Sequence, residues 1–241
     1  MLMKLLAYCR GKNLTSFMLF FALVIGLTHL VNLVAMKLGL INFTLTGRFL
    51  WAYLLQNIIL CTVLYFWFYR RFPRERKLIQ WRIKSVSQLI GAVVLIFASY
   101  FSLIFGLHYI QDLLGLSVLP GLGQQASLLT QVNSPLGYIS IIIAAVFLAP
   151  VIEEYVFRGW GMLCLPTDKW PLFSILVNGL LFALLHFQLA VLIPLIFLGC
   201  MLAWTRLRTQ SILPGLVFHI LNNSLAFLGD IAQNWPHLGS S

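Results

Sequence analysis

Long apolar runs constrain the fold of this 241-residue chain more than any other feature. A transmembrane α-helix needs roughly 20 apolar residues, and seven runs approach or exceed this length. These runs lie at about residues 14–36, 49–69, 86–110, 136–157, 172–188, 189–205 and 212–231. We therefore expect an all-α fold, a polytopic transmembrane helix bundle built from about seven apolar segments.

The composition supports a membrane protein and excludes other classes. Hydrophobic residues make up 61% of the chain and charged residues only 9%, whereas soluble domains carry roughly a quarter. A transmembrane β-barrel would show alternating segments of about ten residues, and the sequence has none. The net charge of +10 falls mainly in loops, so it indicates orientation rather than nucleic-acid binding. We expect one integral membrane domain over residues 1–241, in contact with lipid and not with nucleic acid.

The loop after the second apolar run carries the densest basic cluster. Its basic residues are Arg70, Arg71, Arg74, Arg76, Lys77, Arg82 and Lys84. The positive-inside rule predicts that this loop is cytoplasmic, and alternation of the segments then makes the N-terminus cytoplasmic too. The short, apolar chain favours a bacterial plasma membrane. The polar stretch 111–135 is expected to be an external loop or a re-entrant piece.

Two adjacent glutamates, Glu153 and Glu154, lie near the end of the fourth apolar run. Ionisable groups at membrane depth are costly and usually mark functional sites. Glu154 and Arg158 are four residues apart, so on a helix they share a face and can form an ion pair. Glu153 points about 100° away around the helix and can face a different partner. A charged cluster at the membrane interface would explain Arg158, because its long side chain can reach water. It would not explain the two glutamates, whose side chains are short.

Two histidines in later apolar runs complete a set that can hydrolyse an amide. They are His186 and His219, and Asn223 shares a helix face with His219. A glutamate can take a proton from water as general base, while histidine and asparagine donate to an oxyanion. Alternatively, Glu153, His186 and His219 can bind zinc, which activates water. The residues alone leave both arrangements open.

Other membrane chemistries find less support in the sequence. There is no HExxH motif, no GxSG serine motif, and no second intramembrane aspartate beside Asp230. A proton-coupled transporter remains an alternative, but many transporters show a repeat across two halves and none is visible here. His29, His108 and His237 lack polar neighbours at helical spacing and are expected to be structural or interfacial.

Three motifs in order, Glu153-Glu154-xxx-Arg158, Phe182-xxx-His186 and His219-xxx-Asn223, resemble those of the CPBP intramembrane proteases. That family includes type II CAAX prenyl endopeptidases and bacterial bacteriocin-processing or self-immunity proteins. The resemblance covers about residues 136–226, a motif-bearing protease core. It implies an endopeptidase acting on a peptide or membrane-protein substrate, with prenylated C-termini as the eukaryotic class. The family also holds regulators and scaffolds, so a non-catalytic role is the alternative.

The resemblance also implies a role for each motif residue. Glu153 would be the activating carboxylate, supported by Glu154 and Arg158. His186 would help to activate water or bind metal. His219 and Asn223 would form a metal ligand or the oxyanion clamp.

The predicted segment ends conflict with this site. At 1.5 Å per residue, His186 lies roughly 20 Å from the start of the fifth segment, far from the level of Glu153 and His219. Either residues 159–171 enter the membrane region, or the fifth and sixth segments are not full crossings. Glycines and prolines between 159 and 171 suit an irregular connection, which a membrane protein tolerates where it lines a cavity.

Overall fold

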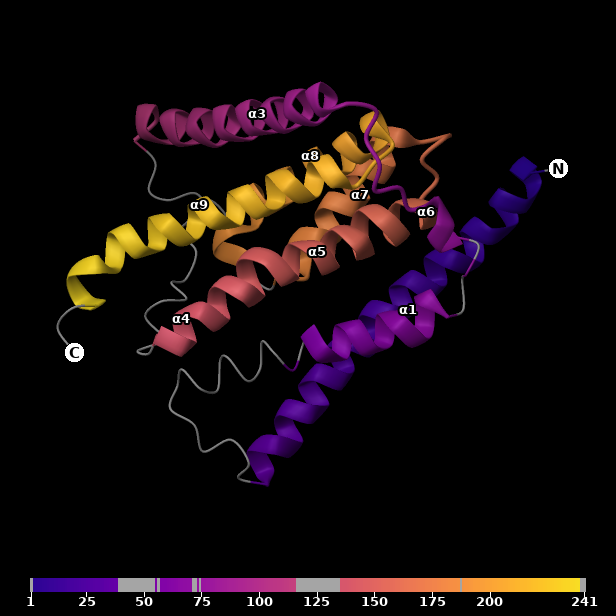
Figure 1. Cartoon of the computed structure of the whole chain (residues 1–241), viewed down its shortest axis with the longest axis horizontal. Helices are drawn as coiled ribbons and strands as arrows, with labels where there is room; N and C mark the ends of the chain where they lie inside the picture. The colour runs from indigo at the N-terminus through magenta and orange to yellow at the C-terminus, as the bar shows by residue number, and fades with distance from the viewer. Residues whose placement is uncertain are drawn as a thin grey trace. The chain divides into compact units, whose positions relative to one another are not determined.

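The computed structural model describes residues 2–38, 55, 57–70, 73, 75–115, 135–186 and 188–238. Throughout these ranges the regular structure is helical, so the predicted all-α class is confirmed (Figure 1). The helices are α1 (Leu2–Lys37), the π-helix η1 (Tyr65–Tyr69), the 3₁₀ helix η2 (Glu75–Leu78), α3 (Val86–Leu113), α4 (Pro135–Ile141), the π-helix η4 (Ile142–Leu148), α5 (Ala149–Glu153), the π-helix η5 (Glu154–Gly161), α6 (Met162–Cys164), α7 (Pro171–Leu184), the 3₁₀ helix η6 (Leu189–Val191), α8 (Leu192–Thr209) and α9 (Leu213–Leu238).

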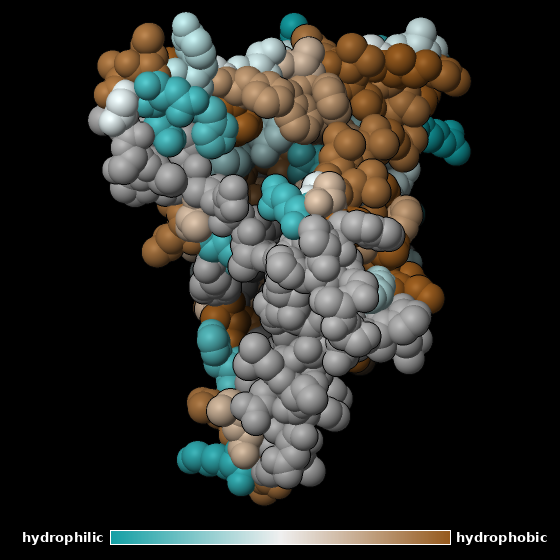
Figure 2. Space-filling model, turned by 90° about the vertical axis from the view of Figure 1, so that its left-hand side faces the viewer, coloured by the Kyte–Doolittle hydropathy of each residue, from teal (hydrophilic) through white to brown (hydrophobic). Residues whose placement is uncertain are grey.

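The described part of the chain contains helices that fit a bilayer. Four are long and apolar enough to cross it: Val86–Leu113, Gly137–Cys164, Leu189–Thr209 and Leu213–Gln233. Shorter apolar helices occupy Phe17–Val31, Asn57–Tyr69 and Pro171–Leu184. Large hydrophobic side chains are exposed on them, and Figure 2 shows hydrophobic residues over much of the visible described surface. The protein is therefore an integral membrane protein of the predicted polytopic helical class.

Two segment ends differ from the prediction, and both differences bear on the site. The fourth segment does not stop at residue 157, because α5, η5 and α6 continue one helical run to Cys164. The fifth segment is only Pro171–Leu184, 14 residues long. Pro171 is its first residue, a position that suits proline because its missing N–H would be unpaired there anyway. Each of the two predicted solutions therefore holds in part: residues 159–164 continue the fourth span, and the fifth segment is too short for a full crossing, whereas the sixth, Leu189–Thr209, is long enough to cross.

The described residues form two compact units, each made of separate chain segments. The first unit comprises Met1–Arg76, Ser127–Ile152 and Ile220–Ser241, and the second comprises Lys77–Ala126 and Glu153–His219. The predicted single domain over 1–241 stays a prediction. Residues 116–134, most of the predicted external or re-entrant stretch, lie outside the described residues.

The core of the second unit is built around α8. Helices α7 and α3 both pack on α8, and η5 contacts α7 and α8. Phe97 and Tyr100 of α3 pack against the buried ring of Phe218, in the first part of α9. These contacts hold η5, which carries Glu154 and Arg158 of the acidic motif, against α7 and α8.

Candidate functional site

The acidic motif forms a buried ion pair. Arg158 Nη1 lies 3.1 Å from Glu154 Oε1, and both side chains are fully buried. The predicted pairing of residues four apart is therefore confirmed, although they lie in a π-helix rather than an α-helix. Burial of a carboxylate is costly unless a partner compensates its charge. The ion pair with Arg158 therefore lowers the free-energy cost of burying Glu154.

Arg158 is held from two further sides. Its Nη2 donates to the carbonyl oxygen of Gly199 in α8 at 3.0 Å, and its guanidinium lies 4.5 Å from the centre of the Phe182 ring. Close packing of α7 on α8 makes this geometry possible, because a Cβ added to Gly199 would lie 2.7 Å from the Cα of Gly179. Small residues permit such close approach of membrane helices.

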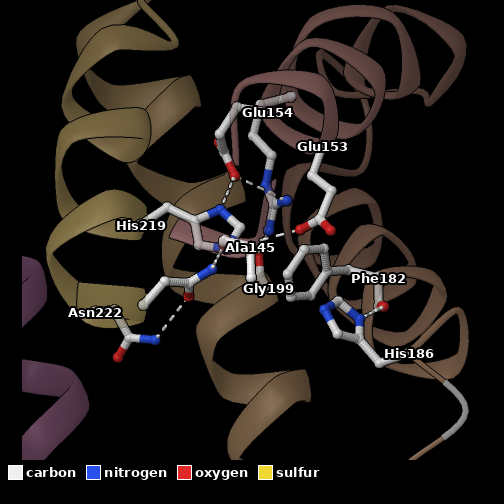
Figure 3. Close-up of polar contacts among 10 residues, drawn as sticks. Ala145, Glu153, Glu154, Phe182, His186, Gly199, His219 and Asn222 are labelled. Atoms are coloured by element: carbon white, nitrogen blue, oxygen red, sulfur yellow. Dashed lines mark hydrogen bonds and ion pairs between the residues drawn. The ribbon is translucent and has the colours of Figure 1, made fainter. Parts of the chain in front are cut away.

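His219 of α9 lies between the two glutamates (Figure 3). Its Nδ1 donates to Glu154 Oε1 at 3.1 Å, and its Nε2 lies 3.6 Å from Glu153 Oε2. The contact with Glu154 is a hydrogen bond, and it orients the imidazole ring of His219. The distance to Glu153 is too long for a direct bond. The imidazole is 2% exposed, so the surrounding side chains enclose it, and the bond to Glu154 fixes its orientation.

The two glutamates have different environments, as the helical spacing predicts. The Glu153 side chain is 23% exposed, whereas that of Glu154 is fully buried. Glu154 Oε2 is enclosed without a hydrogen-bond partner, and a Cβ added to Gly215 would lie 3.1 Å from it. Glu153 is therefore the carboxylate that a reactant can reach, and Glu154 is the one that supports the site.

His186 adjoins this cluster through Phe182. Its Nδ1 bonds to the Phe182 carbonyl oxygen at 2.8 Å, so Nδ1 carries the hydrogen and the neutral ring keeps a free lone pair on Nε2. The Phe182 ring lies 4.6 Å from the His186 ring and 5.7 Å from the His219 ring, between ring centres. The structure thus brings both histidines against one aromatic side chain, although no hydrogen bond or ion pair joins them to each other.

The predicted zinc ligands do not form a closed group in this conformation. Within the described ranges, no three His, Cys, Asp or Glu side chains are placed together so that they could hold a metal ion. Glu153 and His219 lie close together, but His186 is turned to its own helix by the bond to Phe182. Zinc binding stays a prediction.

Asn223 belongs to the first unit and has a structural contact there. Its Nδ2 donates to the carbonyl oxygen of Ala145 in η4 at 2.9 Å, and its Oδ1 lies 3.5 Å from Asn222 Nδ2. It follows His219 by four residues in α9, so the predicted shared helix face holds. The role of Asn223 as an oxyanion donor stays a prediction.

The sequence interpretation missed Asn178. This residue of α7 is fully buried, and its Nδ2 donates to the Phe157 carbonyl oxygen at 2.9 Å. The same carbonyl accepts the N–H of Met162, five residues later, which is the π-helical pattern of η5. Short π-helical segments frequently occur at functional sites. An asparagine inside an apolar run was the available signal, but only the fold shows which carbonyl it binds.

We expect Asn178→Ala to lower both stability and activity, because the second donor to Phe157 is lost and η5 is less firmly held. Loss of a buried hydrogen bond typically costs about 1–3 kcal/mol. Ser174→Ala is a matched control, since Ser174 is buried in the same helix but bonds only within it, to Trp170. Thermal unfolding and turnover should fall further for Asn178→Ala. Equal effects of the two variants would contradict a positioning role.

Residues 135–225 match the family model described as type II CAAX prenyl endopeptidase Rce1-like. The matched stretch is less than half of the chain, and it contains every residue of the three motifs. It agrees with the predicted 136–226 core to within one residue at each end. No curated protein and no solved structure matches the chain. The family match confirms the predicted resemblance to the CPBP intramembrane proteases.

Proposed function

We propose that this membrane protein, whose residues 135–225 match the Rce1-like model, is an endopeptidase that cleaves a peptide bond with activated water. One observation carries the proposal: His219 lies between a buried glutamate paired with arginine and a second glutamate that is accessible. A carboxylate–imidazole pair beside a free carboxylate is an acid–base arrangement of the kind that amide hydrolysis requires.

Each side chain has a distinct proposed role. Glu153 accepts a proton from water as the water attacks the scissile carbonyl carbon, and returns it to the leaving amine. Glu154 fixes the orientation of His219 through Nδ1, as a carboxylate does in other hydrolytic sites. Arg158 balances the charge of Glu154 and stays out of contact with substrate. The separation of 3.6 Å between His219 Nε2 and Glu153 Oε2 suits groups that act together on one reactant rather than bond to each other.

Charge balance favours a donating role for His219. Glu153 and Glu154 carry two negative charges, and Arg158 supplies one positive charge. An imidazolium at His219 makes the cluster neutral, which a membrane environment favours. Its Nε2–H then points to the accessible side, where it can donate to the oxyanion formed in the reaction. The free Nε2 lone pair of His186 suits it to help activate the water.

The proposed substrate is a peptide or membrane protein that reaches the site from the bilayer. The family description names prenyl endopeptidases, so a prenylated C-terminal peptide is the first candidate. The basic loop supports a cytoplasmic N-terminus, and the compact apolar chain supports a bacterial plasma membrane. Both assignments are part of the proposal.

The test is cleavage by the purified protein in detergent or nanodiscs. Prenylated and unmodified fluorogenic peptides, together with transmembrane reporter peptides, should be incubated with the protein and the products identified by mass spectrometry. Cleavage at one defined bond supports the proposal. If well-folded protein cleaves none of them and Glu153→Gln still alters a cellular phenotype, a scaffold or regulator is the better assignment.

Metal content separates the two water-activating arrangements. If Glu153, His186 and His219 gather around zinc, the purified protein should hold about one equivalent. His186→Ala should then lower the zinc content, and chelation should abolish activity. Full activity in metal-free, chelator-treated protein would instead support water activated by glutamate and histidine alone. Atomic emission and activity assays on the same sample decide between these outcomes.

A further inference from the structure

Arg206 is a buried arginine to which the described residues offer no counter-charge. It lies in the last turn of α8 and is 8% exposed. Its Nε is enclosed without a hydrogen-bond partner, and it forms no ion pair with any residue that the structure describes. A guanidinium keeps its charge in proteins, so this charge must be compensated from elsewhere or remain a cost to folding.

The other buried arginine of the second unit has its charge balanced within the chain. Arg158 has the carboxylate of Glu154, the carbonyl of Gly199 and the ring of Phe182. Arg206 has none of these kinds of partner. The same unit therefore supplies one buried arginine with a carboxylate counter-charge, whereas the described residues supply none to the other, which points to a partner outside the chain.

Arg206 lies on the packed face of α8. It follows the buried residues Leu202 and Ala203 by four and three positions, so they share a face. Arg208, by contrast, is exposed, and its guanidinium lies 5.6 Å from the centre of the Trp204 ring. Next to Arg206, the hydroxyl oxygen of Thr205 is also enclosed without a partner. Two adjacent polar groups thus remain unsatisfied at this end of α8.

The surroundings of this helix end are basic. The backbone N–H of Ile212, just after α8, donates to the carbonyl oxygen of Gln80 at 2.9 Å. This bond places the loop with Lys77, Arg82 and Lys84 beside the turn that follows α8. The sequence has no Asp or Glu at 77–111 or 169–229. An anion that neutralises Arg206 is therefore not supplied by these segments.

We propose that Arg206 binds the phosphate group of an anionic lipid headgroup, assisted by the basic 77–84 loop. Arg206 lies in the last turn of a helix long enough to cross the bilayer. The end of such a helix lies at the level of the headgroup phosphates. Trp204 and Trp81 lie near the same end, as interfacial aromatic residues do. Arginine suits this ligand because its planar donors match phosphate oxygens. The site is separate from the glutamate–histidine cluster and does not depend on the proposed proteolysis.

The test compares Arg206→Gln with Arg208→Gln, which removes the same charge from the same helix at an exposed position. Purified protein is titrated with phosphatidylglycerol, phosphatidylcholine or inorganic phosphate, and bound molecules are counted by native mass spectrometry. The wild type should prefer phosphatidylglycerol. Arg206→Gln should weaken this binding roughly 10- to 100-fold, as expected for losing charge-assisted hydrogen bonds. Arg208→Gln should retain nearly all of it.

Thermal unfolding provides an independent readout. Without anionic lipid, Arg206→Gln should be at least as stable as the wild type, because an uncompensated buried charge is removed. With phosphatidylglycerol the order should reverse, since the lipid stabilises only the protein that binds it. If Arg206→Gln does not fold, Arg206→Lys keeps the charge without the planar donors and should show weakened binding in its place.

Three outcomes would overturn the proposal. Unchanged phosphatidylglycerol binding by the Arg206 variants would exclude the residue as a ligand. Equal losses in the Arg206 and Arg208 variants would indicate a diffuse basic surface instead of a site. Arg206-dependent binding of inorganic phosphate in preference to phosphatidylglycerol would identify a soluble anion, not a lipid, as the ligand.

Discussion

Glu153→Gln is expected to leave a folded protein with no detectable peptide hydrolysis. The amide keeps the size of the side chain but cannot accept a proton as a general base. Glu153 is partly exposed and its nearest charged atom, His219 Nε2, lies 3.6 Å away. Partly exposed interactions of this kind contribute little to stability, so the unfolding temperature should change only slightly. Single-turnover cleavage and thermal unfolding of the same preparation measure the two effects separately.

Two exposed histidines serve as controls for the Glu153 variant. His29 lies in α1 and His108 in α3, and neither belongs to the cluster. His29→Ala and His108→Ala should therefore both cleave substrate at nearly the wild-type rate. Cleavage by Glu153→Gln at the wild-type rate would exclude Glu153 as the general base and contradict the proposed mechanism.

The local part of the site was predictable from the sequence. The four-residue spacing of Glu154 and Arg158 predicts their ion pair, and the offset of Glu153 predicts a different environment. Both rest on helix geometry within one segment. The apolar runs likewise predict the all-α membrane class, because a helix pairs all its backbone groups within one segment and the alternating pattern of a β-barrel is absent.

The long-range part of the site was not predictable. The bond between His219 and Glu154 joins residues 65 positions apart, and helix periodicity does not say which helices meet. The helices around this bond pack closely at Gly179 and Gly199, where a side chain would clash, and a Cβ at Gly215 would lie 3.1 Å from Glu154 Oε2. A single sequence shows these glycines but not their partners. The bond of Asn178 to Phe157 and the burial of Arg206 were missed for the same reason.

The end of the fourth segment shows how element length misled the geometry. With that end at residue 157, Glu153 was placed near the cytoplasmic side and far from His186, whereas the helical run continues to Cys164 and Glu153 lies eleven residues before its end. The bond from His186 to Phe182 and the ring contact of Phe182 with His219 then bring the motifs together. The motif order was a better guide to the site than the segment ends, because helix ends depend on tertiary contacts that periodicity does not contain.

Arg158→Met is expected to be the most destabilising change in the site. Met fills much of the space, but Glu154 is left fully buried with His219 as its remaining partner. Removing one partner of a buried ion pair typically costs on the order of 3–5 kcal/mol. The contacts to Gly199 and Phe182 are lost as well. We expect a large fall in yield and in unfolding temperature, measured by size-exclusion chromatography and a thermal-shift assay.

A double variant distinguishes charge from packing as the cause. Glu154→Gln with Arg158→Met removes both charges, and the new amide oxygen can still accept the hydrogen of His219 Nδ1. This protein should be more stable than Arg158→Met alone, because no unpaired carboxylate remains in the interior. It should nevertheless be much less active, since a neutral amide oxygen accepts the hydrogen of His219 Nδ1 more weakly than a carboxylate and orients the ring less firmly. The losses of stability of Glu154→Gln alone and Arg158→Met alone are measured beside it. If they simply add up to the loss of the double variant, the two charges are not coupled, and Arg158 acts through its contacts with α7 and α8.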